Sequence, residues 1–209
     1  MTDPRALSAL AHRAPIDVAG VAALSERAFE TIAILRGDEK TVRGPLQSAL
    51  DLSRPARIGE TTAAGALVAI QTSPDETILL APEAGGAALL ATLRAALGDS
   101  HHQLVDVSDH LATLTLAGPR ARDLLSKLVT IDLHPRAFTA GAAVATLLGK
   151  AAVTLWLEAE DDAAATFRIV VRRSFADYAW RLLAEAGREW GLPEQPARGI
   201  VNLESGAPH

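Results

Sequence analysis

The residues best suited to chemistry gather in one stretch, residues 101–110, which reads HHQLVDVSDH. Its imidazoles and carboxylates are His101, His102, Asp106, Asp109 and His110. These side-chain types bind transition metals. Their spacing matches no familiar ligand pattern, however, and the chain has no second histidine cluster to complete a site. Adjacent histidines in a polar loop are more often solvated, so the pattern favours a solvated loop over a metal site.

Two serines, Ser108 and Ser174, lie in segments with clear strand and helix patterns. Neither lies in the Gly-x-Ser-x-Gly turn that exposes a hydrolase nucleophile. Ser174 precedes an apolar helical run, and Asp177 follows three residues later, as in a capping box. We therefore predict that Ser174 caps the last helix, and the sequence argues against a hydrolase.

Possible anion contacts are few. The pair Gly85-Gly86 precedes a helical run, but without a following Lys-Ser/Thr pair it favours a turn over a phosphate loop. Arg120 and Arg122 stand at the start of another helix, where positive charge opposes the helix dipole. A ligand carboxylate, an acidic face of a partner, or Asp123 and solvent could each offset that charge. For Arg172 and Arg173 the same three contacts, with a ligand, with a partner or with nearby acids and solvent, stay open.

The composition narrows the function further. The formal net charge is -5, with 20 Lys and Arg against 25 Asp and Glu, so no basic surface for nucleic acid is expected. Cysteine is absent, which excludes disulfides, thiolate metal sites and thiol nucleophiles. No run of 18 uncharged apolar residues and no signal-peptide core occurs. We expect a protein of the reducing cytoplasm that contacts neither membrane nor nucleic acid.

The elements that must position these residues follow from periodicity. Alternating or continuous apolar runs predict strands, and leucines at helical spacing predict helices. Gly and Pro mark a turn over residues 36–45. Gly118-Pro119 start the helix that contains Leu124 and Leu125, which we expect in the core. The expected strands are residues 28–35, 65–71, 76–82, 111–117, 151–159 and 166–173, and the expected helices are residues 46–52, the leucine-rich run 89–97, residues 119–128 and residues 174–190.

Paired strands followed by a helix recur along the chain, which predicts an α+β fold with helices packed on mainly antiparallel sheet. The order is that of ferredoxin-like β/α repeats, possibly duplicated. We divide the chain into an N-terminal arm (residues 1–20), which must dock to become ordered, a main domain (residues 21–190) and a C-terminal tail (residues 191–209).

Residues 62–190 resemble the folate-binding domain of glycine cleavage aminomethyltransferases. The similarity rests on Asp106-Val107-Ser108, the following strand, GPRARDLLSKLVTIDL and Gly141, and it continues through AAVTLWL to FRIVVRRSFADYAWRLLAEA. In that family a Gly-Gly-x-x-Asp-Asp strand carries the catalytic aspartate. The matching residues 149–154 read GKAAVT, so Val153 and Thr154 replace both aspartates. A valine can neither stabilise an iminium charge nor relay a proton.

The chain is also similar to the gamma subunits of heterotetrameric sarcosine oxidases, through ILRGD, LSRPARIGET and SPDETILLAP. This resemblance implies a subunit with no catalytic, cofactor-binding or metal-binding residues of its own. Its partners would be the alpha, beta and delta subunits, which would hold FAD, FMN, NAD, zinc and tetrahydrofolate. The complex would oxidise sarcosine to glycine with oxygen, giving hydrogen peroxide and formaldehyde or methylene-tetrahydrofolate.

Two other readings stay open: a stand-alone folate-dependent aminomethyltransferase-like protein, and a folate-fold binding module with an unrelated partner. The transferase would need another acid, and Asp132 is the candidate that the motif offers. We expect Asp132 to form a cap or turn at the end of the helix instead.

Overall fold

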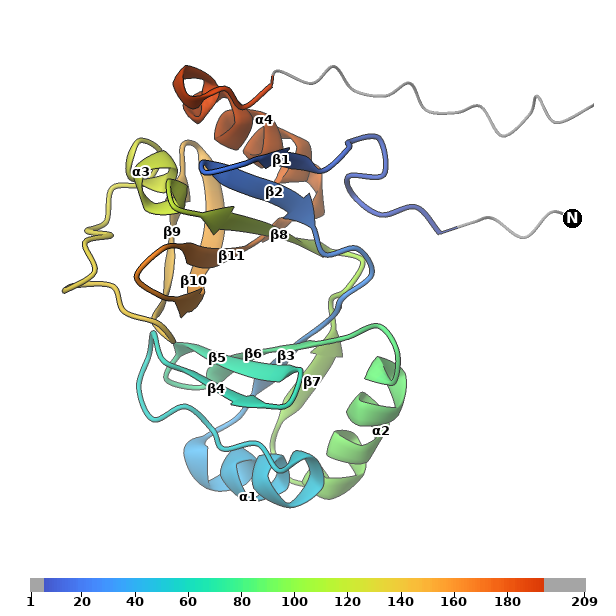
Figure 1. The fold of residues 1–209 in the computed structure, drawn as a ribbon. Coiled ribbons are helices and arrows are strands. Elements are labelled where there is room, and N and C mark those ends of the chain that lie inside the picture. Colours follow the sequence, from blue (N-terminus) through green and yellow to red (C-terminus); the bar gives the residue numbers. More distant parts are fainter. Residues whose placement is uncertain (1–5, 194–209) are drawn as a thin grey trace, which may run out of the picture.

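The computed structural model describes residues 6–193, which form two antiparallel sheets packed face to face between helices. Figure 1 shows one sheet with α3 and α4 on its outer side and the other with α1 and α2 on its outer side. Between the sheets lies a smaller apolar cluster that includes Ile70, Trp156 and Val170. The predicted α+β class with antiparallel sheet is confirmed. The layers follow the order helices, sheet, sheet, helices.

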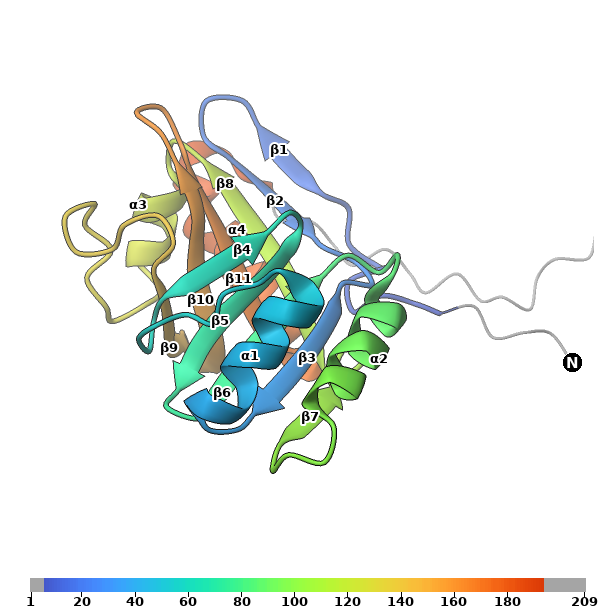
Figure 2. The same ribbon diagram turned by 90° about the horizontal axis from the view of Figure 1, so that it is seen from below.

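The five-stranded sheet has the order β4 (Thr61–Ala64), β5 (Leu67–Ser73), β6 (Glu76–Ala81), β3 (Thr31–Arg36) and β7 (Gln103–Asp106). Helices α1 (Glu39–Leu50) and α2 (Gly86–Leu97) lie across its outer face (Figure 2). Along the chain the order is β3, α1, β5, β6, α2 and β7, with the edge strand β4 added between α1 and β5. This is the β-α-β-β-α-β order of a ferredoxin-like unit.

The six-stranded sheet has the order β1 (Ile16–Val18), β2 (Ala22–Glu26), β8 (Leu111–Gly118), β11 (Ala165–Arg172), β10 (Ala151–Glu160) and β9 (Ala143–Leu148). Helices α3 (Ala121–Ser126) and α4 (Ala176–Ala186) cover it, and short 3-10 turns lie at Arg173–Phe175 and Arg188–Trp190. The arrangement repeats the other sheet, except that β2, from the start of the chain, takes the place of the last strand. The predicted ferredoxin-like repeat is therefore duplicated, with its second copy closed by the N-terminal segment.

The N-terminal segment packs on this chain's own core. Leu10 and Ile16 are both 2% exposed and belong to the cluster beneath α4. Glu26 accepts hydrogen bonds from the Ser8 hydroxyl at 2.6 Å and from the Leu10 amide at 3.1 Å. Residues 6–18 of the expected N-terminal arm therefore dock on this chain's own core. Residues 1–5 of the arm and 194–209 of the tail lie outside the described residues.

Helix α1 begins seven residues before its predicted start, so the turn predicted over residues 36–45 is wrong. Asp38 caps the helix by accepting a hydrogen bond from the Thr41 amide at 2.7 Å. Pro45 lies inside the helix, where it removes one intrahelical donor. The capping signal of Asp38 outweighs the Gly44-Pro45 pair that indicated a turn.

The capping box predicted at Ser174 is also wrong. Ser174 lies in the 3-10 turn before α4, and Phe175 is the N-cap, without a side-chain hydrogen bond. The Asp177 carboxylate instead contacts the His12 ring at 2.8 Å and accepts a hydrogen bond from Arg13 at 2.6 Å. Helix α3 likewise starts at Ala121, two residues after the expected Pro119.

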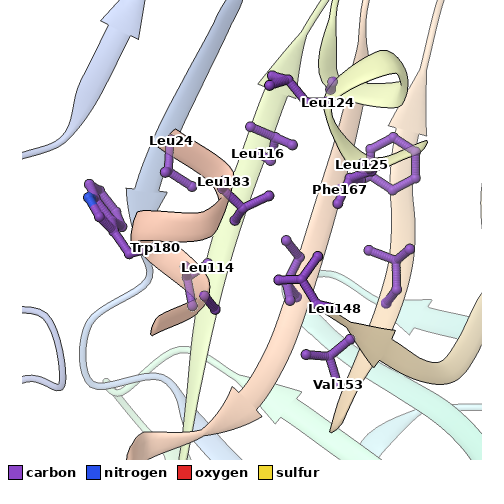
Figure 3. Close-up of a cluster of buried hydrophobic side chains, with 14 of the residues drawn as sticks. Leu24, Leu114, Leu116, Leu124, Leu125, Leu148, Val153, Phe167, Trp180 and Leu183 are labelled. Atoms are coloured by element: carbon purple, nitrogen blue, oxygen red, sulfur yellow. The ribbon is translucent and has the colours of Figure 1, made fainter. Parts of the chain in front are cut away.

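The largest core lies between the six-stranded sheet and the helices α3 and α4 (Figure 3). Leu124 and Leu125 are both 0% exposed there, as predicted. In the part of the chain that the structure describes, no helix is long and apolar enough to cross a membrane.

Candidate functional site

The Asp-Val-Ser motif joins the two sheets. The Val107 amide donates to the Ile32 carbonyl at 2.8 Å, and the Ile32 amide donates to the Ser108 hydroxyl at 3.0 Å. That hydroxyl in turn donates to Asp106 at 2.5 Å. All three residues thus hold the link between β7 and β8 against β3, and Ser108 serves as a structural link in this region.

The metal-ligand types of residues 101–110 do not gather into a site. His102 Nδ1 lies 2.8 Å from the Ser100 carbonyl oxygen, within its own loop. Asp106 is occupied by Ser108. Among residues 6–193, no group of three or more His, Cys, Asp or Glu side chains is placed to hold a metal ion.

The positions that match the transferase aspartates lie on β10, after the turn at Gly149. Gly149 has a φ of +58°, and a Cβ there would lie 2.5 Å from the Tyr178 hydroxyl, so the turn needs glycine. Val153 is 5% exposed and belongs to the core cluster on the side of the sheet that α3 and α4 cover (Figure 3). Thr154 follows on the opposite face of the strand, because successive side chains alternate. Neither face of β10 therefore carries a carboxylate here.

Asp132, the alternative acid, lies in the segment between α3 and β9. Its carboxylate accepts a hydrogen bond from the His134 amide at 2.8 Å, two residues on. This contact confirms the expected turn, although the turn lies beyond the helix end at Ser126.

Gly85 and Gly86 form the turn before α2. Gly85 is the N-cap with a φ of +89°, and a Cβ on Gly86 would lie 1.9 Å from the Thr31 hydroxyl. Glycine is needed at these positions for backbone conformation and for close packing, which agrees with the prediction of a turn.

The arginines flagged in the sequence contact their own chain. Arg120 pairs with Asp123 at 2.9 Å. Arg122 pairs with Glu160 at 2.5 Å and donates to the backbone carbonyls of Leu133 and Phe138, which fixes the segment between α3 and β9. Arg122 is thus held by an acid of a distant strand, a partner that was not among the three alternatives.

One polar cluster was missed in the sequence: a buried ion pair on the inner side of the six-stranded sheet. Arg168 Nη2 donates to Glu30 Oε1 at 2.5 Å, and the two side chains are 3% and 6% exposed. The guanidinium carbon lies 5.4 Å from the Trp156 ring centroid, and Glu158 lies 3.9 Å from Nη1. Burial lowers the pKa of Arg168, and the Glu30 carboxylate opposes this shift.

A sequence signal for this pair did exist. In the strand TFRIVV, Phe167 and Ile169 share the apolar face, so Arg168 must point to the other side of a sheet that is buried on both faces. A charge in such a strand requires a partner. That Glu30 supplies it, 138 residues away, could not be read from spacing.

The chain is similar in sequence to one family of known proteins. Residues 38–189 match the model of the family described as "Sarcosine oxidase, gamma subunit family". The sarcosine oxidase subunit gamma of an Arthrobacter species is 34% identical over 177 residues, covering 84% of each chain.

Two solved structures share the fold. A chain of the heterotetrameric sarcosine oxidase from Corynebacterium sp. U-96, in complex with pyrrole 2-carboxylate, superposes with a TM-score of 0.81 and 32% identity over 91% of this chain and 99% of that chain. The aminomethyltransferase T of the glycine cleavage system from Bartonella henselae gives a TM-score of 0.63 at 15% identity. This chain covers 47% of that protein, and the match shows a shared fold alone.

Proposed function

Because the chain belongs to the sarcosine oxidase gamma subunit family, we propose that it is a non-catalytic subunit that supports assembly of a heterotetrameric sarcosine oxidase. The proposal rests on two findings together: the chain matches gamma subunits over most of its length, and β10 lacks the two aspartates of the transferases. Val153 and Thr154 stand where a transferase has its two aspartates, and Val153 is packed in the core.

The partners in this proposal are the alpha, beta and delta subunits of the same oxidase. They would hold FAD, FMN, NAD, zinc and tetrahydrofolate, while this chain would contribute no catalytic, cofactor-binding or metal-binding residue. The assembled enzyme would oxidise sarcosine to glycine with oxygen in the cytoplasm. It would release hydrogen peroxide, and formaldehyde or methylene-tetrahydrofolate.

The structure supports an assembly role through the way its own polar groups are used. Ser108, Arg122 and Asp177 each contact another segment of this chain. These groups therefore serve the fold, which leaves the outer surface as the part of the chain through which we expect it to act.

The test is affinity purification of the tagged full-length chain after co-expression with the genes adjacent to its own. We expect stoichiometric large subunits and bound flavin in the eluate, and no flavin on the chain expressed alone. Tight stoichiometric binding of tetrahydrofolate to the isolated chain, measured by calorimetry, would instead favour the transferase reading. Recovery of the chain without any partner would contradict the subunit proposal.

A further inference from the structure

Two aromatic side chains lie on the surface at the start of α4. Phe175 is 42% exposed and Tyr178 is 37% exposed, and neither belongs to a core cluster of residues 6–193. Their rings meet edge to face, with the centroids 6.5 Å apart. This geometry is favourable for an aromatic pair. The two rings therefore form one apolar feature outside the core.

The helix itself gives no reason for a phenylalanine at this position. Phe175 is the N-cap of α4 and makes no side-chain hydrogen bond there. N-caps favour Ser, Thr, Asp and Asn, because these side chains accept a hydrogen bond from a free amide of the first turn. A contact outside this chain would explain the aromatic residue.

Two basic side chains adjoin the rings. Arg181 follows Tyr178 by three residues, which places both on the same face of α4. Lys150 lies in the turn between β9 and β10, and its backbone amide donates to the Tyr178 hydroxyl at 3.1 Å. Both basic side chains are exposed, and the structure shows no ion pair for either within the described part of the chain.

Four residues form what we call the α4 surface: Phe175, Tyr178, Arg181 and Lys150. The acids of α4, Asp177 and Glu185, pair with other basic groups of this chain. The α4 surface thus keeps two positive charges on a chain whose formal net charge is -5. Charges across a protein interface are complementary, so a partner that covers this surface must supply carboxylates.

We propose that the α4 surface docks an acidic segment of a larger subunit of the oxidase, which rests on the subunit role proposed above. Carboxylates of that segment pair with Arg181 and Lys150, and an apolar side chain packs on the rings of Phe175 and Tyr178. Aromatic residues and arginine are enriched at the centres of protein interfaces. A guanidinium group also holds a carboxylate through two parallel hydrogen bonds.

The test is a competition inside cells that express all subunits of the oxidase. Two full-length versions of this chain, the parent and a variant of different mass, are expressed together and compete for one place. The complex is purified through a tag on its largest subunit. Mass spectrometry gives the ratio of parent to variant in the complex and in the lysate, and the quotient of these two ratios gives the relative affinity.

The decisive variant is Lys150→Gln with Arg181→Gln, which removes both charges and keeps the side chains polar. We expect the parent to be enriched over this variant on the order of tenfold, because the partner's carboxylates lose their countercharges. The control is Lys40→Gln with Arg94→Gln. Lys40 and Arg94 are likewise exposed and show no ion pair within residues 6–193, and they lie on α1 and α2, on the opposite outer side of the molecule (Figure 1). We expect no enrichment of the parent over this control.

A second variant, Phe175→Ser, separates docking from folding. Serine is a favoured N-cap, so the melting temperature of the isolated chain should equal or exceed that of the parent. The parent should still be enriched over this variant in the complex, because the partner loses a ring to pack on. A ring that serves only the fold would instead lower the melting temperature when it is removed.

The outcomes separate failure of this proposal from failure of the subunit role. Equal recovery of the parent and the Lys150→Gln with Arg181→Gln variant would overturn the proposal and leave the subunit role standing. Equal enrichment over the control variant would overturn it too, by assigning the effect to net charge. If the isolated parent chain forms a dimer that this variant dissolves, a second copy covers the surface and the proposal is wrong. Absence of the parent from the purified complex would refute the subunit role itself.

Discussion

Replacing Arg168 with methionine tests the buried ion pair between the sheets. Methionine retains an apolar stem but removes the buried cation of Glu30, whose carboxylate is 6% exposed and then keeps only the half-exposed Arg27, 3.5 Å away. Removing one partner of a buried pair costs about 3 to 5 kcal/mol. The total free energy of unfolding of a domain is only about 5 to 15 kcal/mol. For a chain of this size each kcal/mol lowers the melting temperature by about 2 to 4 °C, so we expect a fall of about 6 to 20 °C.

The assays are thermal unfolding for the melting temperature and urea denaturation for the free energy of unfolding, each followed by far-UV circular dichroism and by tryptophan fluorescence. The double variant Glu30→Leu with Arg168→Met should recover most of the loss, because apolar replacement of both partners removes the uncompensated charge. Arg43→Met is the control for loss of an arginine from an exposed pair, since Arg43 and Glu39 are 73% and 62% exposed. It should change the free energy of unfolding by no more than about 0.5 kcal/mol.

Two outcomes would refute this reasoning. Arg168→Met could lie within about 1 kcal/mol of the parent, which would mean that Glu30 is solvated or neutralised by other means. Alternatively, the double variant could be as unstable as Arg168→Met, which would place the loss in packing against Trp156 and not in charge.

Further stability predictions follow from the core, from Gly86 and from the N-terminal contact. Leu124→Ala should cost roughly 2 to 5 kcal/mol, because the side chain is 0% exposed; a parent-like denaturation midpoint would contradict its place in the core. Gly86→Ala should cost about 1 to 3 kcal/mol through its clash with Thr31; a melting curve equal to that of the parent would be inconsistent with this close contact. The Arg13 hydrogen bond, helped by His12, lowers the pKa of Asp177. Its stabilising contribution is therefore present above the unfolded pKa of about 3.9 and is lost as pH falls through the folded pKa. Asp177→Asn should thus lower the melting temperature at pH 7, by an amount limited by the partial exposure of Asp177, and this difference should shrink in strong acid; a pH-independent difference would rule out the charge as its source.

Elements with strong periodicity could be predicted from the sequence, while those set by tertiary contacts could not. The alternation of leucines and threonines in β8 and the leucine spacing of α2 decide their type locally. Strand β1 has three residues, too few for a period, and it is held by pairing with β2. Helix α1 was placed too late because Pro45 interrupts a helix that Asp38 nucleates.

The candidate site was predictable only where a motif fixed its position. The resemblance located residues 149–154, and the structure shows how Val153 is used instead of an acid. The ion pair between Glu30 and Arg168 could not be predicted from the sequence, because each charge gains its partner only when β2, β8 and β11 align side by side. The contact between Asp177 and the N-terminal segment was not predicted for the same reason, and the capping box at Ser174 offered another role for Asp177.

The most direct test of the assembly role is a comparison of the oxidase purified from cells that express all its subunits with the oxidase from cells that lack this one gene. Size-exclusion chromatography gives the assembled fraction, and peroxide release per bound flavin gives the activity of each assembled enzyme. We predict one copy of this chain in each full complex and a marked loss of assembled enzyme when the gene is absent. If the remaining subunits instead form an equally abundant and equally active complex while this chain elutes alone, the account is wrong.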